Sequence, residues 1–483
     1  MCVRTVSKEV RPIRLAQFSA QPERQFMQIK PKAVLFLWLL LRLSVVGQAQ
    51  FFYATNNNKL TIVAYTGSAS TVTIPSAVDG LPVVAIASKV FINSRLTGVT
   101  IPSSVTSIGS SAFAGCTALT SVVIPNGVTS LAASIFSGCY GLTSVVIPGS
   151  VTSIGNSAFA DCKRLTSVTI PNGVIYISSG AFAGLTGLTQ ITIPRSVTYL
   201  DYLAFSGSVG LASISVDDLN PAYCSVDGVV FNKARTTLVK MPEGWKGSFV
   251  VPDGVTSIGV LACAGCRGLT DVSIPDSVTG LEVGAFSDCS ALTGITLPSR
   301  ITSIETYAFT SCSRLTQITI PSEATYIGDH AFAYCVGLTS VTIPSGVKSI
   351  DSSAFANCTN LNAVYFQGDA PHMTPSAFTG VHELTFYCLP ERLGWSVSFG
   401  GLVAVLWDPQ IKTGDASFGV QAGLFGFDIA CPNDLGFVVE ATTNLAKPDW
   451  VPVSTNTIVA GGASFSDPQW KNFPGRLYRL RMP

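Results

Sequence analysis

The stretch LTSVTIPNGVIYISSGAFAGLTG, Leu165 to Gly187, decides the fold of this chain because close copies of it follow one another along most of the sequence. The apolar residue before a proline marks the repeat, and within each of two runs it recurs every 23 residues. The markers are Ile101, Ile124, Ile147, Ile170 and Ile193, then Val251, Ile274, Leu297, Ile320 and Ile343. Self-similarity at such a period predicts a solenoid, in which each coil buries its apolar face only against neighbouring coils.

Residues that occupy the same position in successive coils form a column, and the leucine column opens each coil. Its members are Leu96, Leu119, Leu142, Leu165, Leu188 and Leu211, then Leu269, Leu292, Leu315, Leu338, Leu361 and Leu384. The pattern L-x-x-V-x-I predicts a short strand with its apolar members inward, and the following proline ends it because proline cannot donate to a ladder. A second apolar pair, such as Val105 and Ile108, predicts a second short strand on the opposite side.

Each coil closes with A-F-x-x-C, which defines a phenylalanine column and a cysteine column. The cysteine column contains Cys116, Cys139, Cys162, Cys266, Cys289, Cys312, Cys335 and Cys358. Thirteen cysteines in a secreted chain would usually indicate a disulfide framework. However, Leu185 and Ser208 share the column, so the position requires a small buried side chain, and we expect a ladder of free thiols. Disulfides between neighbouring coils stay open as the alternative, because their distance allows them.

Composition excludes two classes of function. Charged residues make up 12% of the 483 residues and the formal net charge is +1, which argues against binding to nucleic acid. Apolar residues make up 47%, but they are spread over repeat positions and are not gathered into membrane-spanning runs. A buried stack of coils is the interpretation that fits both numbers.

The N-terminal segment predicts export. Lys30 and Lys32 precede the apolar stretch 33–46, and small residues come just before Gln50, which is the layout of a secretory signal peptide with Met27 as its start. A membrane anchor is the alternative, but the stretch is short for one. We therefore expect a secreted or cell-surface protein with no transmembrane span after cleavage.

The predicted fold is mainly β, with a right-handed solenoid of 23-residue coils and short parallel strands, followed by a small antiparallel β-sandwich. The sequence FFYATNNNKLTIVAYTG, from Phe51, predicts a β-hairpin at the start. An insert breaks the period, and it predicts a hairpin-like excursion on one coil. The expected parts are an N-terminal extension and signal peptide (1–49), a cap with irregular first coils (50–95), the solenoid (96–388) with its insert (217–250), a C-terminal cap and linker (389–409) and the sandwich (410–483).

The repeat resembles the BspA-like (Treponema-type) leucine-rich repeat, as in LTSVVIPGSVTSIGNSAFADC, Leu142 to Cys162. The resemblance extends from about Leu81 to Phe386, and it implies a right-handed solenoid of the kind found in surface or secreted proteins that bind host or matrix proteins. The C-terminal stretch from FVVEATTNLAKPDW to RLYRLRMP is similar to a module appended to such repeats in Verrucomicrobia-type bacteria. The family therefore implies adhesion, although a fold does not dictate its ligand.

The candidate ligand residues lie at the outward x positions of the strands and in the insert. Threonine suits an exposed strand, which explains most of the outward pattern without any ligand. The functional interpretation is a flat polar face that binds an extracellular protein or matrix ligand, or a polysaccharide. Insert residues are added because inserts often mark a binding face, although the favoured interpretation of the insert is a long coil that packs on itself. The candidates are Thr166, Thr169, Gln190, Thr192, Tyr223, Lys240, Trp245, Gln317, Thr319 and Thr342.

No motif for catalysis emerges from the sequence. Three histidines, His330, His372 and His382, are not spaced as metal ligands, and the acidic residues are scattered singly. Cys263 and Cys266 spell C-x-x-C, but each occupies a structural column and no second pair accompanies them. We expect no enzyme, no cofactor and no metal. The leading hypothesis is a non-catalytic adhesion or protein-binding scaffold; the alternatives are a structural envelope spacer and a glycan-binding protein, which a localised aromatic patch would favour.

Overall fold

The computed structural model describes residues 51–395, 398–399, 402–414, 417–421, 424–430, 436–444, 449–457, 462–473 and 475–482. The predicted N-terminal extension and signal peptide lie outside these residues, as do parts of the predicted linker and sandwich. Residues from Gln48 onward form one compact unit. In the described ranges the secondary structure is β-strand with two short 3-10 helices, η1 (Pro375–Phe378) and η2 (Trp470–Asn472), so the mainly β prediction is confirmed.

The predicted N-terminal hairpin is confirmed. Strand β1 (Phe51–Asn56) pairs antiparallel with β2 (Lys59–Tyr65). Asn57 and Asn58 turn the chain with φ of 47° and 56°, and a two-residue turn with positive φ at both positions matches the twist of a hairpin. Strand β2 then pairs parallel with β5 (Leu81–Ile86), so the hairpin covers the first edge of the solenoid.

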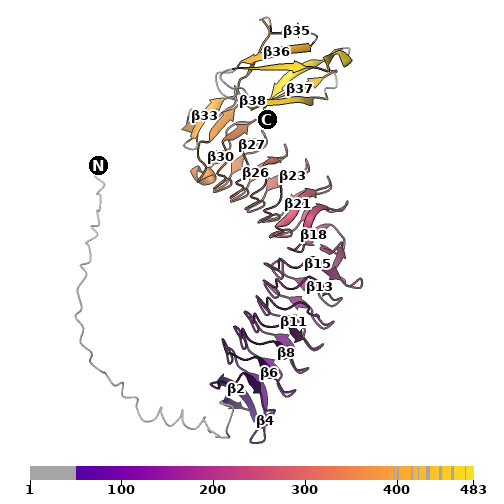
Figure 1. The fold of residues 1–483 in the computed structure, drawn as a ribbon, viewed down its shortest axis with the longest axis vertical. Coiled ribbons are helices and arrows are strands. Elements are labelled where there is room, and N and C mark those ends of the chain that lie inside the picture. The colour runs from indigo at the N-terminus through magenta and orange to yellow at the C-terminus, as the bar shows by residue number, and fades with distance from the viewer. Residues whose placement is uncertain are drawn as a thin grey trace, which may run out of the picture. The chain divides into compact units, whose positions relative to one another are not determined.

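The strands after the leucine column form the first face of the solenoid, and its coils follow one another in chain order (Figure 1). Neighbouring strands pair in parallel at the repeat spacing, as Ser121 does with Ser144. The first-face strands are β3 (Thr71–Thr73), β6 (Gly98–Thr100), β8 (Ser121–Val123), β10 (Ser144–Val146), β13 (Gln190–Ile193), β15 (Ser213–Val216), β19 (Lys246–Val250), β21 (Gly268–Ser273), β23 (Gly294–Thr296), β25 (Gln317–Thr319), β27 (Ser340–Ile343), β29 (Ala363–Phe366), β31 (Thr385–Cys388), β32 (Ser398–Phe399) and β33 (Leu402–Leu406).

The second apolar pair of each coil forms a second face of short strands, as predicted. These two-residue strands also pair in parallel from coil to coil, for example Ile154 with Ile177. The second-face strands are β7 (Ser107–Ile108), β9 (Ser130–Leu131), β11 (Ser153–Ile154), β12 (Tyr176–Ile177), β14 (Tyr199–Leu200), β20 (Ser257–Ile258), β22 (Gly280–Leu281), β24 (Ser303–Ile304), β26 (Tyr326–Ile327), β28 (Ser349–Ile350) and β30 (His372–Met373). Strand β5 precedes them and pairs parallel with β7, while β4 (Ala77–Val78) pairs antiparallel with β5.

One predicted strand is not formed. Residues 165–170 carry the consensus L-T-S-V-T-I, yet they lie outside any strand, so the first face is interrupted between β10 and β13. Leu165 and Ile170 remain buried as in other coils. The coil therefore keeps its core contacts while its ladder of backbone hydrogen bonds opens, and the sequence of this coil offers no physical reason for the opening.

The phenylalanine column forms a stack of rings along the core. Neighbouring rings lie with centroids 5.0 to 5.8 Å apart and planes within 14° of parallel, from Phe91 to Phe205 and again from Phe286 to Phe378. Cys263 interrupts the column, and its side chain is buried in the same core. Because each ring contacts the ring of the coil before and after it, the stack couples coils that are 23 residues apart.

The cysteine column consists of buried free thiols, which confirms that prediction for the described residues. Each thiol of the column donates a hydrogen bond to a backbone carbonyl 24 to 26 residues earlier, usually that of the phenylalanine column, such as Cys335 Sγ to Phe309 O at 3.1 Å. The Ser208 hydroxyl makes the same bond to Phe182 O at 2.8 Å. The column therefore accepts a buried side chain that need not donate, as Leu185 shows, and cysteine adds a weak hydrogen bond without the cost of burying a stronger polar group.

We expect the thiols of Cys312 and Cys358 to be unreactive while the chain is folded. Burial raises the pKa of Cys312 and of Cys358 to about 12, and a thiol must lose its proton to act as a nucleophile. Titration with a thiol-specific disulfide reagent at neutral pH should leave Cys312 and Cys358 unmodified in buffer and modify them in denaturant. Rapid modification of either thiol in the native chain would contradict this prediction. Half-buried Cys224 is the internal comparison.

The insert 217–250, which we call the excursion, replaces part of a coil with a three-stranded antiparallel meander, β16 (Tyr223–Val226), β17 (Val229–Asn232) and β18 (Thr237–Lys240). The predicted hairpin-like excursion is therefore confirmed. Strand β18 then pairs parallel with β20 and restarts the second face. Side chains of β17 divide the interior, because Val230 belongs to the core before the excursion while Val229 and Phe231 belong to the core after it.

Three side chains of the excursion take over hydrogen bonds that a regular coil would supply. In other coils a glycine N–H, such as that of Gly184, donates to a carbonyl of the next coil. At Gly207 the acceptor is the buried Glu243 carboxylate, at 3.0 and 2.9 Å. Asn220 donates to the carbonyls of two residues of the preceding coil, and Tyr223 Oη accepts from Leu200 N at 3.1 Å. Side chains thus satisfy backbone groups that burial would otherwise leave unpaired.

Two antiparallel sheets follow the last coil. The first contains β34 (Gln410–Lys412), β35 (Gly419–Gln421), β36 (Leu424–Ala430) and β39 (Gly462–Asp467), and the second contains β37 (Gly436–Thr442), β38 (Val451–Thr457) and β40 (Leu477–Arg481). Their shared core includes Phe427, Phe437 and Phe465, and it continues onto Tyr365 of β29. The C-terminal module therefore packs against the last coils through an apolar interface.

Candidate functional site

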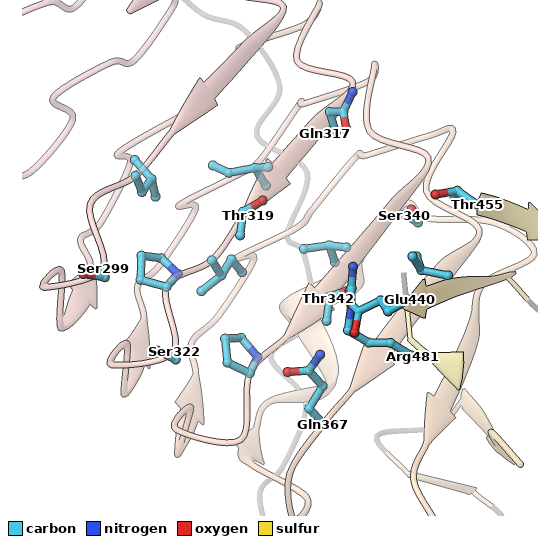
Figure 2. A pocket seen from close by; sticks show the side chains of 17 residues that line it. Ser299, Gln317, Thr319, Ser322, Ser340, Thr342, Gln367, Glu440, Thr455 and Arg481 are labelled. Carbon is cyan, nitrogen blue, oxygen red and sulfur yellow. The ribbon is translucent and has the colours of Figure 1, made fainter. Parts of the chain in front are cut away.

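A groove of about 790 Å³ lies between the C-terminal module and the first face of the solenoid. Its solenoid wall is formed by β25 and β27, whose outward residues Gln317 and Thr319 are exposed, while Thr342 is half-buried. Val438, Glu440, Thr455 and Arg481 from β37, β38 and β40 form the other wall, and Figure 2 shows the labelled side chains of both walls converging on this space. Three of the candidate residues are thus brought together with the module.

The alternation of β37 explains why its polar side chain faces the groove. Phe437 and Val439 point into the core of the module, so Val438 and Glu440 point to the opposite face of the strand. Glu440 is buried, and its carboxylate accepts hydrogen bonds from Arg481 Nε at 2.6 Å and Arg479 Nε at 2.8 Å. The charged atoms of the groove are therefore already paired with each other.

The Glu440 cluster predicts a dependence of stability on pH. Burial alone would raise the pKa of Glu440, but the hydrogen bonds from Arg481 and Arg479 outweigh it, and the net pKa is lowered. A carboxyl whose pKa is lower in the folded state contributes stability above its unfolded pKa, near 4.3, and loses that contribution as the pH falls through the folded value. We expect acid titration below about pH 4.5 to destabilise the wild-type chain more than Glu440→Gln. Equal slopes for the two chains would contradict the prediction.

Four other candidate residues line a second cavity. Thr166, Thr169, Gln190 and Thr192 surround a space of about 440 Å³, which lies where the first face is interrupted beside β13. They are all exposed. The predicted binding face is therefore divided between the groove and this second cavity, because the ten candidates come from coils on both sides of the excursion.

The three candidates from the insert have structural roles, and the prediction that Lys240 contacts a ligand is wrong. Its side chain is 4% exposed, with Nζ 3.9 Å from Glu243 Oε1, so it is not available to a surface ligand. The prediction failed because lysine is almost never buried, and only a buried carboxylate nearby makes that possible. Tyr223 is half-buried with its hydroxyl bound to Leu200 N, and Trp245 packs edge-on against Phe249 with centroids 5.3 Å apart.

The chemistry available at the groove is recognition by polar contacts. Its side chains offer hydroxyls and amides, and its one carboxylate is held by two guanidinium groups. Within the described ranges, no group of three His, Cys, Asp or Glu side chains is arranged to hold a metal ion. His330 is half-buried, with Nδ1 2.8 Å from Asp329 Oδ1 and its ring 5.0 Å from that of Tyr307.

Comparison with known families identifies the repeat. The model of the BspA type leucine rich repeat region matches residues 84–212 and 247–362 in six copies, and the gap between the two matches coincides with the excursion. The chain belongs to this family. The predicted resemblance is therefore confirmed for the repeats, whereas the match does not extend to the C-terminal module. A search of the curated proteins finds no match.

Two solved structures show the same architecture. A leucine rich cell surface protein from Faecalibacterium prausnitzii is 35% identical, and the alignment covers 67% of this chain and 96% of that one with a TM-score of 0.56. The pneumococcal vaccine antigen PcpA is 21% identical over 72% of this chain and 93% of that one, with a TM-score of 0.58, and shows a shared fold. The family thus consists of repeat scaffolds of the cell-surface type, and the matches indicate no catalytic family.

The structure also finds residues that the sequence did not nominate. Glu440, Arg481 and Thr455 lie outside the repeats, so no column predicted that they would face Gln317 and Thr319. No helix in the described part of the chain is long and apolar enough to cross a membrane. A group of exposed tyrosines on the second face was likewise missed, although its 23-residue spacing is visible in the sequence.

Proposed function

We propose that this chain is a non-catalytic scaffold, secreted or held at the cell surface, that binds an extracellular protein or matrix ligand at the groove between β25, β27 and the C-terminal module. The observation that carries the proposal is the groove itself, which combines a flat row of hydroxyl and amide groups with a second wall from the module. A similar protein is a cell surface protein by description, which supports the location.

The groove favours a polar partner segment over a small apolar molecule. Outward threonines and glutamines supply donors and acceptors along the strands, and the Glu440–Arg481 pair supplies a fixed dipole at one end. A partner laid along β25 and β27 would replace water on many weak contacts. Many weak contacts hold only if water is excluded around them. One bulky substitution in the groove should therefore weaken binding, because it keeps the two surfaces apart.

The test is a binding screen of the chain from Gln50 to Pro483 against immobilised matrix proteins, followed by two matched variants. Thr319→Arg places a long cation in the groove, and Thr100→Arg places the same cation at the equivalent column position of β6, far along the chain. We expect Thr319→Arg to weaken binding about tenfold or more, and Thr100→Arg to leave it unchanged. Equal affinities of the two variants, or no protein ligand at all, would overturn the proposal and favour a structural spacer.

A further inference from the structure

Two neighbouring coils carry exposed tyrosines on the second face, where most coils carry serine. Tyr176 of β12 pairs in register with Tyr199 of β14, their side chains are 52% and 48% exposed, and their ring centroids lie 6.2 Å apart. The serines at the same column position are Ser107, Ser130, Ser153, Ser257, Ser303 and Ser349. Serine therefore satisfies the fold at this position, and the pair of rings is an addition to it.

More aromatic and acidic groups gather around Tyr199. Tyr202 is 44% exposed, and both it and Tyr223 are close enough to act electrostatically on the Tyr199 hydroxyl. The Asp201 carboxylate lies 3.4 Å from that hydroxyl and, as the largest influence, raises its pKa. We call Tyr176, Tyr199, Tyr202 and Asp201 the tyrosine patch. The patch borders the excursion through Tyr223, so the exposed tyrosines and the insert, which both depart from the repeat, lie next to each other.

The exposure of these rings has no role in holding the fold together. Each ring could bury far more area than it does here, and clustered exposed aromatics mark interaction surfaces. Tyr326 occupies the same column in the later coils, but Ser303 and Ser349 are its neighbours and its hydroxyl is bound to Asp351 at 2.6 Å. This isolated tyrosine is thus held by the following coil, whereas the patch presents a pair of neighbouring exposed rings.

We propose that the tyrosine patch binds a neutral, extended polysaccharide whose pyranose rings stack on Tyr176 and Tyr199. The face of an aromatic ring is negative, and a pyranose with equatorial hydroxyls presents a face of weakly positive C–H groups to it. Tyrosine hydroxyls and the Asp201 carboxylate at the edge of the rings accept hydrogen bonds from sugar hydroxyls. Rings from successive coils suit successive units of a straight chain.

Charge and size argue for this ligand over others. The Asp201 carboxylate beside Tyr199 repels acidic or sulfated glycans, which leaves neutral ones. A stable protein–protein interface takes roughly 20 to 30 residues on each side. The patch comprises a few rings set among serines and threonines of neighbouring coils, such as Ser153 and Thr198, which is too little apolar surface for a protein but sufficient for stacked sugars.

The test measures binding of cellohexaose and chitohexaose to the full chain by isothermal titration calorimetry, with maltohexaose and hexagalacturonate as a curved and an acidic comparison. The variants are Tyr199→Ser and Tyr176→Ser with Tyr199→Ser, because serine is the residue that other coils carry there. Tyr326→Ser is the matched control in the same column. We expect each stacked ring to account for about threefold to tenfold in Kd, so the double variant loses detectable binding while Tyr326→Ser binds like wild type.

Three results would overturn the inference. One is that no neutral β-linked oligosaccharide binds the wild-type chain, and another is that the double variant binds as well as Tyr326→Ser. The third is that the double variant loses a protein ligand of the groove and no sugar, which would make the patch part of a protein interface. Because Thr319→Arg tests the groove and not the patch, failure of the proposed function and failure of this inference are distinguishable.

Discussion

Replacing Phe309 by alanine is expected to lower the free energy of unfolding by about 3 to 5 kcal/mol. Its ring is fully buried, and it stacks on Phe286 and Phe332 with centroids 5.6 and 5.4 Å apart. Alanine would remove contacts with both neighbouring coils and leave a cavity that backbone ladders on both faces prevent from closing. Denaturant unfolding followed by circular dichroism measures the loss.

Two companion variants make the Phe309 result interpretable. Phe309→Leu keeps most of the apolar volume, so it should cost clearly less than alanine. Thr319→Ala lies in the next coil with an exposed side chain, and it should change stability by no more than about 0.5 kcal/mol. A loss below about 1 kcal/mol for Phe309→Ala would mean that the ring stack does not couple the coils.

The second large effect is expected at Glu243, where alanine should cost about 3 to 5 kcal/mol. The substitution removes the acceptor for Gly207 N and leaves the Lys240 ammonium buried beside no carboxylate. The lysine keeps one long hydrogen bond, from Nζ to Leu261 O at 3.4 Å, which cannot offset its desolvation. The same denaturant experiment measures the loss.

A double-mutant cycle separates the two contributions at Glu243. Lys240→Met with Glu243→Ala removes both charges, and it should be more stable than Glu243→Ala alone because no unpaired charge remains buried. Glu243→Gln keeps a carbonyl acceptor for Gly207, so it should fall between wild type and alanine. If Lys240→Met fails to rescue Glu243→Ala, the cost arises from the Gly207 contact and not from the charge.

The repeat columns were predictable from the sequence because each coil sees the same surroundings. Once the 23-residue period is recognised, Phe309 and Cys312 inherit the burial of every other member of their columns. The free thiols followed from Ser208 and Leu185 in the same column, since neither can form a disulfide. Physical requirements that recur ten times leave a clear trace in the sequence.

The parts that occur once were not predictable. Lys240 and Glu243 are charged residues in a polar insert. Their burial depends on the interruption of the repeat at this point, where the Glu243 carboxylate replaces the carbonyl that a regular coil would offer to Gly207 N. The groove depends on how the C-terminal module packs against Tyr365, and no repeat sets that contact. Tyr176 and Tyr199 are an intermediate case, because they lie one period apart in a column that is mostly serine. A search for residues that differ from the usual residue of their column would have found them.

The division of the interior by β17 has a consequence for how heat damages the protein. Val230 on one side and Val229 with Phe231 on the other belong to separate cores, and the tyrosine patch and the groove lie over different ones. Repeat proteins lose structure in blocks where coupling between neighbours is weakest. On heating, the tyrosine patch and the groove should therefore be inactivated at different rates, and a molecule that has lost one surface can still present the other.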